Sequence, residues 1–178
     1  MQKLTIVICT HNRSNLLMQT IKSLNGAIFP KNCTIQILII ANACTDNTIT
    51  LLNNYQSKQK KTLLPLTVVE ELTPGKSFAL NHAIDIIDNG FLCFVDDDQR
   101  VDKNYLTAIK EAINTHSKTS IFCGPILPDW TGLEPAWVHE TGKYKIYPEP
   151  IPHFELGSKS LRVSINTMLP GGGTLIVK

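Results

Sequence analysis

Short apolar segments alternate along the chain with longer segments in which apolar residues recur every three or four positions. The short segments are typical of buried strands and the longer ones of amphipathic helices. Strands are predicted over 4–9, 34–41, 66–70, 91–95 and 120–123, with helices starting near 14, 46, 76 and 102 between them. This alternation, with short connections, predicts an α/β fold: a mostly parallel, Rossmann-like sheet with helices on both faces.

The predicted helices differ in how clearly their buried faces and caps are marked. In the first, Ser14 or Asn15 is expected to cap the helix, and the apolar face comprises Leu16, Leu17, Ile21 and Leu24. Thr45 or Asp46 is expected to cap the second. The third is expected to bury Phe78, Ala79, Ala83, Ile84 and Ile87, and the fourth Leu106, Ile109 and Ile113.

The chain changes character after Gly124, where prolines and aromatic residues recur without helical or strand periodicity. Such a stretch is loop-rich, and long irregular segments in compact domains are usually functional. We predict one domain over 1–178, in which 1–123 form the ligand-binding βα region and 124–178 an incomplete loop-rich region. Gly171–Gly173 lead into a strand from residue 174 that needs neighbours, so we expect a fragment or a naturally truncated chain.

Composition narrows the classes of function. The chain has 178 residues, 43% of them hydrophobic and 18% charged, which is ordinary for one soluble domain. Its net charge of +2 is too small to predict nucleic acid or an acidic membrane surface as a partner, and no segment is predicted to be a signal peptide or to span a membrane. The five cysteines show no metal or disulfide spacing and are predicted to be reduced thiols of a cytosolic protein. Lys58–Lys61 are interpreted as a solvated helix end.

The most informative stretch is Asp96-Asp97-Asp98, which directly follows the apolar strand 91–95. Three adjacent carboxylates repel one another, and a divalent cation with open positions for substrate phosphates would relieve that repulsion. An isolated acidic run is more often a solvated loop. Its place at the carboxyl end of an interior strand of a parallel sheet, where open α/β sheets bind ligands, favours the functional interpretation.

Three further polar segments follow predicted strands: 10–13, 42–46 and 74–77. In a parallel sheet all of them reach the same edge as the acidic run, together with helix N-termini. A nucleoside diphosphate with a metal ion suits this set. Asn and Thr side chains would contact base and ribose, Lys76 a phosphate, and Asp98 the metal. Each turn alone is weak evidence, because these residue types favour loops anyway.

Taken together, the segments resemble a known family. The runs 5–13 (TIVICTHNR), 39–48 (IIANACTDNT) and 94–98 (FVDDD) look like successive signatures of glycosyltransferase family 2, which has the GT-A fold. The segment 75–84 (GKSFALNHAI) resembles the helix between the second signature and the metal motif, and 171–178 (GGGTLIVK) the strand after the acceptor-side loop. The resemblance covers the whole chain, and the combination is more specific than any single motif.

The resemblance implies transfer of a sugar from a nucleoside-diphosphate donor, with inversion and assisted by Mg²⁺ or Mn²⁺. The acceptor would be a saccharide, a lipid-linked molecule or a protein, and the enzyme would be cytoplasmic or peripheral at the inner face of the membrane. Asp98 and Asp96 would bind the metal as ends of a DXD motif. The candidate substrate-binding residues are Thr10, His11, Asn12, Arg13, Asn42, Lys76, Asp96 and Asp97.

The sequence also departs from the family pattern. Ala41 stands where many members have an Asp that contacts uracil, so Asn42 is a candidate to replace it, and Leu80 replaces a frequent Arg. Inversion needs a general base, which family members carry in a helix that would lie beyond Lys178. The alternative is therefore a catalytically silent nucleotide-sugar-binding module. A sugar nucleotidyltransferase ranks last, because 10–14 lack the glycine-rich phosphate loop expected of that class.

Overall fold

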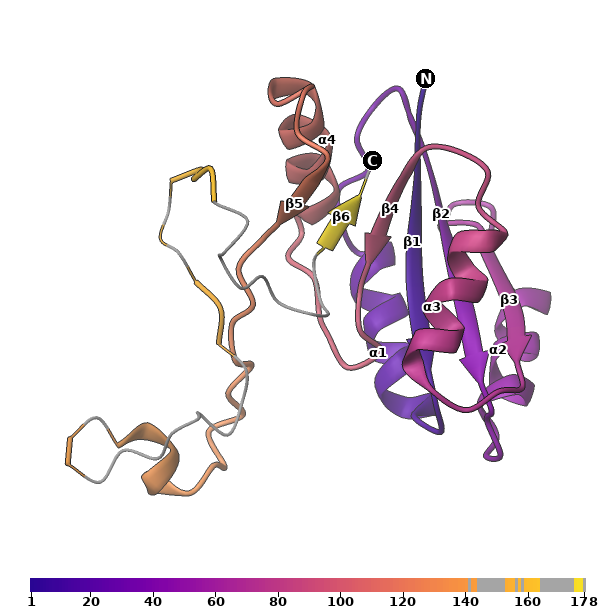
Figure 1. Cartoon of the computed structure of the whole chain (residues 1–178). Helices are drawn as coiled ribbons and strands as arrows, with labels where there is room; N and C mark the ends of the chain where they lie inside the picture. Colours follow the sequence, from indigo (N-terminus) through magenta and orange to yellow (C-terminus); the bar gives the residue numbers. More distant parts are fainter. Residues whose placement is uncertain (141, 144–152, 156, 158, 164–174, 178) are drawn as a thin grey trace. The chain divides into compact units, whose positions relative to one another are not determined.

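The computed structural model describes residues 1–140, 142–143, 153–155, 157, 159–163 and 175–177 (Figure 1). Strands and helices alternate up to residue 123, as predicted. In chain order the elements are β1 (Gln2–Thr10), α1 (Ser14–Asn25), β2 (Cys33–Asn42), α2 (Thr48–Ser57), β3 (Leu66–Glu71), α3 (Lys76–Asp85), β4 (Phe91–Phe94), α4 (Tyr105–Thr115), β5 (Ile121–Cys123), the 3₁₀ helix η1 (Ala136–His139) and β6 (Leu175–Val177).

The strands form one sheet in the order β3-β2-β1-β4-β6-β5. β3, β2, β1 and β4 are parallel, so their carboxyl ends lie at the same edge. β4 is interior, but its second neighbour, β6, is antiparallel to it. The mostly parallel sheet predicted from the sequence is therefore confirmed, and the antiparallel neighbour of β4 is the late strand, which lies between β4 and β5. The predicted glycine turn at 171–173 lies outside the described residues.

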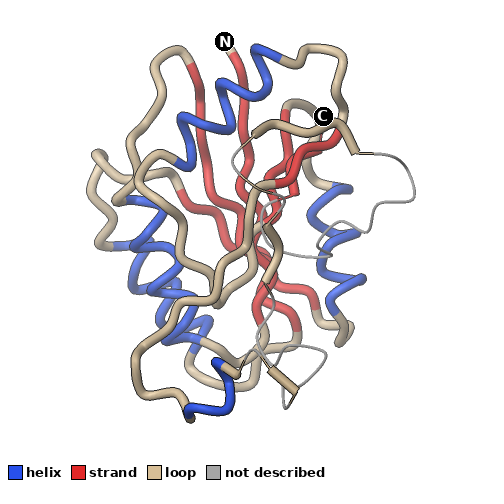
Figure 2. The backbone as a smooth tube through the Cα atoms, turned by 90° about the vertical axis from the view of Figure 1, so that its left-hand side faces the viewer, coloured by secondary structure: helices blue, strands red, loops and turns tan. Residues whose placement is uncertain are grey.

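Helices cover both faces of the sheet (Figures 1 and 2). Along β1, Leu4, Ile6 and Ile8 point into the larger core, which also contains residues of α1, α2 and α4. Val7 points to the other face, where it packs with Ala79 and Ala83 of α3. Alternate residues of a strand face opposite sides, so a strand buried on both faces reads as the continuous apolar run seen in the sequence.

Several side-chain predictions need correction. Leu16 is 41% exposed, Phe78 53% and Ile84 51%, because only the residues of α1 and α3 that face the sheet are buried. Ile87 lies beyond the end of α3 but still packs against the core cluster that contains Ala79 and Ala83. The N-cap position of α1 is Arg13, and no side chain makes a capping hydrogen bond there. Neither Ser14 nor Asn15 is therefore the cap. The expected face of α4 is confirmed, since Leu106, Ile109 and Ile113 are buried.

The chain divides into two compact units, one of 1–122 with 171–178 and the other of 123–170. In the second unit, the described residues include η1 and a single bridge between Ile126 and Phe154. All five cysteines are free thiols, as predicted. Over the described ranges, no helix has the length and apolar character needed to cross a bilayer.

Candidate functional site

The turns after β1 and β2 are joined through Asn12. This residue has a φ of 54°, a left-handed conformation that asparagine tolerates better than most residues. Its Oδ1 accepts hydrogen bonds from the backbone amides of Thr45 (2.7 Å) and Asp46 (3.2 Å), and its Nδ2 donates to the Thr45 hydroxyl (3.0 Å). Asn12 thus holds together the two turns that were predicted to meet at one sheet edge.

The middle residue of the acidic run, Asp97, points into the protein. Its side chain is 7% exposed and accepts hydrogen bonds from the hydroxyl of Thr10 (2.7 Å) and Nη1 of Arg13 (3.2 Å). Its backbone carbonyl accepts a bond from the hydroxyl of Thr20 in α1 (2.9 Å). Asp97 therefore ties the acidic loop after β4 to both the β1 turn and α1, and the hydroxyl of Thr10 is committed to this bond.

The outer two carboxylates point toward solvent and are paired with cations. Asp96 lies 2.6 Å from Nζ of Lys76, the first residue of α3, and Asp98 lies 3.0 Å from Nη1 of Arg13. Asp97, followed by Asp98, holds the pKa of the Arg13 guanidinium above its ordinary value. Both cationic side chains are slightly more than half exposed. Exposed ion pairs contribute only about 0–1 kcal/mol, so Lys76 can leave Asp96 and Arg13 can leave Asp98 at little cost, while Arg13 keeps its bond to the buried Asp97.

Asn42, the last residue of β2, is buried and uses its whole amide group on the neighbouring loop. Its Nδ2 donates to the carbonyls of Glu71 (3.2 Å) and Thr73 (2.6 Å), and its Oδ1 accepts from the amide of Gly75 (2.8 Å). These bonds shape the segment that leads into Lys76. The amide of Asn42 thus holds the loop that carries the cation of Lys76.

Replacing Asn42 with alanine is expected to lower the free energy of unfolding by about 2–4 kcal/mol, because three hydrogen bonds are lost where burial is nearly complete. Asn53→Ala, on the exposed side of α2, is the control and should change it by less than about 0.5 kcal/mol. Urea denaturation of both variants measures the difference. Equal stabilities would show that the amide does not hold the 71–75 loop.

His11 makes hydrogen bonds within the protein on both ring nitrogens. Nδ1 lies 2.7 Å from the carbonyl oxygen of Asn42 and Nε2 lies 3.3 Å from Nδ2 of Asn12. A carbonyl can only accept, so the proton is on Nδ1, and Nε2 accepts from the asparagine. The side chain remains exposed, so it is oriented by β2 while its ring stays accessible at the sheet edge.

A hollow of about 250 Å³ adjoins the pair formed by Lys76 and Asp96. It lies against the sheet face that carries α3, and is lined by Val7, Cys9, Lys76, Ser77, Leu80, Asn81, Ile84, Phe94, Val95 and Asp96. Leu80, where the family often has arginine, makes this wall apolar. Burial raises the pKa of the Cys9 thiol to about 11, so the thiol is neutral there. Typical ligand pockets measure about 300–1,000 Å³, so this hollow accommodates part of a nucleotide sugar at most.

Sequence reasoning missed two contributors. Thr20 lies on the buried face of α1 between Leu17 and Ile21, and a buried hydroxyl at such a position requires a partner. Glu71 accepts bonds from the amide of Thr73 (2.6 Å) and from Nδ1 of His82 (3.0 Å). The Thr73 bond is the main cause of a lowered pKa of the Glu71 carboxyl. No sequence pattern indicated the contact between Glu71 and His82, because the two residues belong to different elements, β3 and α3.

The donor set is compatible with a divalent cation shared with a ligand. Asp96 and Asp98 present hard carboxylate oxygens on the exposed side of one loop, while Asp97 is turned inward. Across the described ranges, no three or more His, Cys, Asp or Glu side chains cluster to enclose a metal by themselves. Mg²⁺ is characteristically held by one or two carboxylates, with substrate phosphates and water completing the shell. Two outward carboxylates meet that requirement.

The proteins to which this chain is similar are glycosyltransferases and related biosynthetic proteins. The family described as Glycosyl transferase family 2 matches residues 5–170. Poly(ribitol-phosphate) beta-N-acetylglucosaminyltransferase TarS of Staphylococcus aureus is 24% identical over 116 residues, which cover 65% of this chain and 20% of TarS. Succinoglycan biosynthesis protein ExoM of Rhizobium meliloti is 24% identical over 135 residues, covering 75% of this chain and 41% of ExoM. The chain thus spans less than half the length of these curated relatives.

Solved structures show the same architecture. TarS 1–349 of S. aureus in complex with UDP-GlcNAc aligns with a TM-score of 0.59 and 22% identity, over 78% of this chain and 38% of that one. The mannosyltransferase PcManGT of Pyrobaculum calidifontis in complex with GDP-Man and Mn²⁺ aligns with a TM-score of 0.58 and 21% identity, over 69% and 35%. At these identities the likeness shows the fold, which is GT-A as predicted.

Proposed function

Because this chain belongs to glycosyl transferase family 2, we propose that it binds a nucleoside-diphosphate sugar and transfers the sugar, with inversion, to an acceptor hydroxyl. The observation that carries the proposal is the meeting of outward Asp96 and Asp98 with Lys76 and Arg13 at one edge of the sheet. A diphosphate needs cations, and a metal-bridged diphosphate also needs carboxylates. Cations and carboxylates are both present here. The pairs Lys76–Asp96 and Arg13–Asp98 are exposed and weak, so a ligand can replace them.

The proposed division of labour follows from burial. Lys76 and Arg13, each about half exposed, turn from their carboxylates to the diphosphate oxygens when the donor binds. Asn12 and His11, at the adjoining edge, are hydrogen-bonded within the protein but exposed, and we assign them to the nucleoside. Thr10, Asn42 and Asp97 are placed in the substrate site by the sequence, but they are buried as well as hydrogen-bonded within the protein. We propose that these three buried residues hold the loops that carry Lys76, Arg13, Asn12 and His11.

Asp96 and Asp98 would hold Mg²⁺ or Mn²⁺. When bound, such an ion supplies Lewis-acid stabilisation of the negative charge that builds up on the departing diphosphate. The relative that was solved with GDP-Man and Mn²⁺ supports the same class of ligand here. Lys76 and Arg13 would add positive charge to the same oxygens, so the loss of either would weaken binding of the leaving group as well as of the donor.

Inversion requires a single displacement. The acceptor oxygen bonds to the anomeric carbon as the bond to the diphosphate oxygen breaks, and a general base takes the hydroxyl proton. We assign no residue as that base. For the acceptor, the candidates remain a saccharide, a lipid-linked molecule or a protein, and the proposed location is the cytoplasm or its face of the membrane.

A panel of nucleotide sugars tests the proposal by thermal shift with and without Mn²⁺. At about 100 times its Kd, a donor stabilises the folded state by about 2.7 kcal/mol, which corresponds to a rise in Tm of roughly 5–10 °C for a chain of this size. One class of donor should give this rise, larger with Mn²⁺. No shift with any nucleotide sugar would contradict the proposal.

Release of nucleoside diphosphate then separates the two functional candidates. If the stabilising donor is turned over in the presence of acceptor mixtures, the chain is a transferase. Binding without release favours the silent nucleotide-sugar-binding module, for which Leu80 in place of the frequent arginine is the specific argument.

A further inference from the structure

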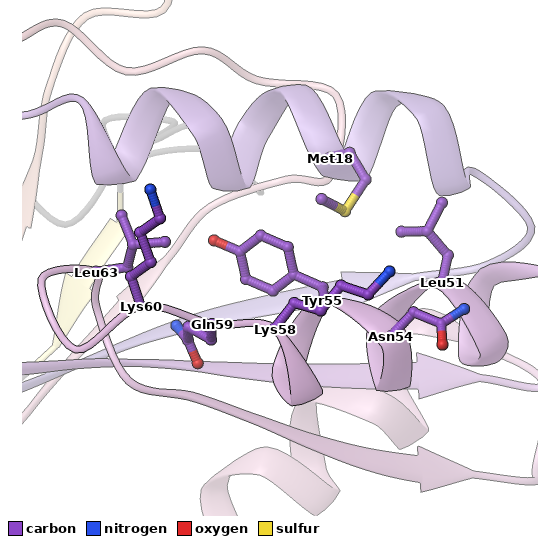
Figure 3. A pocket seen from close by; sticks show the side chains of 8 residues that line it. All are labelled: Met18, Leu51, Asn54, Tyr55, Lys58, Gln59, Lys60 and Leu63. Carbon is purple, nitrogen blue, oxygen red and sulfur yellow. The ribbon is translucent and has the colours of Figure 1, made fainter.

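A groove of about 570 Å³ lies between α1 and α2, separate from the site at the sheet edge (Figure 3). It is lined by Met18, Leu51, Asn54, Tyr55, Lys58, Gln59, Lys60 and Leu63. Figure 3 shows the ring of Tyr55 in the middle, with Met18 reaching toward the groove from α1. Lys60 and Leu63 lie on one side of the ring, and Lys58 extends on the other. The groove therefore has an apolar floor between two cationic side chains.

The charge around this groove is one-sided. Residues 14–25 and 47–69, which include α1, α2 and the turn after α2, contain Lys22, Lys58, Lys60 and Lys61 but no Asp or Glu. Lys22 follows Met18 by four positions, so both lie on the same face of α1. The whole chain has a net charge of only +2, so this cationic surface is local and is offset elsewhere. A solvated helix end, as the sequence suggested, explains Lys58 but not the absence of acidic residues from both helices.

We propose that this surface, defined by the α1–α2 groove with Lys22, Lys58, Lys60 and Lys61, binds the anionic headgroup region of a lipid bilayer. Lysines near an anionic leaflet are attracted without a fixed geometry, which suits four flexible side chains spread around a groove. Shallow insertion of apolar side chains beside a basic patch is a recognised second contribution to peripheral binding. Tyr55 and Met18 are partly buried against the core, so they form the floor of the groove and the lysines supply the main attraction.

An acidic protein segment fits less well. Such a partner needs directional groups that fix its register, whereas two polar lining groups are already used inside the protein. The amide of Gln59 donates to the carbonyl of Leu64, and the hydroxyl of Tyr55 accepts from Nδ2 of Asn25 at 3.2 Å. Apart from the amide of Asn54, the lining then offers apolar side chains and lysines. Spread positive charge of this kind selects the sign of a surface rather than a particular sequence.

Co-sedimentation with vesicles tests the proposal on the full chain. Binding to phosphatidylcholine vesicles that contain 30% phosphatidylglycerol should exceed binding to pure phosphatidylcholine by at least about tenfold, and should weaken at 0.5 M NaCl because salt screens exposed charges. The triple variant Lys58→Glu, Lys60→Glu, Lys61→Glu should lose about tenfold or more in binding to the anionic vesicles.

The matched control carries the same change in net charge at three lysines on or beside α4, none of which lines the groove: Lys103→Glu, Lys110→Glu, Lys118→Glu. It should lose less than about threefold, since the attraction falls off within a Debye length. Equal losses in the two triple variants, equal binding to neutral and anionic vesicles, or binding to poly-glutamate without vesicle binding would each overturn the proposal. Thermal denaturation of the variants verifies that they are folded.

Discussion

Replacing Asp97 with alanine is expected to lower the free energy of unfolding by about 2–4 kcal/mol, although the residue lies in a run of three aspartates. The buried hydroxyl of Thr10 would lose its acceptor, and the guanidinium of Arg13 would lose the better buried of its two carboxylates. The loss of stability should be smaller than for a fully buried ion pair, because the guanidinium of Arg13 is about half exposed and can form hydrogen bonds with water. Urea denaturation measures the effect.

Two further variants make the test specific. Asp97→Asn keeps an acceptor for Thr10 but removes the charge, so it should cost about 1–2 kcal/mol. Asp98→Asn changes an exposed carboxylate in the same run and should cost less than about 1 kcal/mol. If all three variants were equally stable, Asp97 would not be the residue that holds the acidic loop to β1.

Replacing Asp98 with alanine is expected to lower the Mn²⁺-dependent affinity for a nucleoside diphosphate at least about tenfold, with little change in stability. The carboxylate is 46% exposed, and the loss of even an outer partner of a metal ligand typically lowers metal affinity by about 10–100-fold. Isothermal titration calorimetry with and without Mn²⁺ gives the comparison.

The metal-free titration distinguishes the roles that Asp98 can have. Without Mn²⁺, removing Asp98 leaves Arg13 with one carboxylate fewer, so affinity for the diphosphate should stay equal or rise. A fall of the same size with and without Mn²⁺ would contradict a role in metal binding. Asp88→Ala, at an exposed aspartate before β4 and thus at the opposite end of that strand from the acidic loop, should leave both titrations unchanged.

The order of elements could be predicted from the sequence because the strands are apolar on both faces and the helices carry clear periodic stripes. Convergence of the 10–13, 42–46 and 96–98 turns followed from parallel pairing alone. The insertion of β6 between β4 and β5 could not be predicted, since it pairs residues about 80 positions apart that share no local signal. The exposure of Phe78 and Ile84 also depends on which elements pack on α3, rather than on the helix itself.

Within the candidate site, the sequence proposed the residues, whose roles stay a prediction, but it did not indicate which of them point outward and which inward. Asp96, Asp97 and Asp98 are chemically identical, and only the register of the turn after β4 directs the middle one toward Thr10 and Thr20. Likewise, Asn42 was a candidate for contact with the base, whereas its amide is bonded to the backbone of the 71–75 loop. Such roles depend on partners distant in the chain, so local pattern cannot assign them.

The most direct test of the account is calorimetric titration of UDP and GDP into the unmodified chain, with Mn²⁺ and after its removal with a chelator. The account predicts saturable binding of at least one of them that strengthens at least about tenfold in the presence of Mn²⁺. Binding of neither nucleotide, in protein shown to be folded, would contradict the claim that Asp96, Asp98, Lys76 and Arg13 form a diphosphate site.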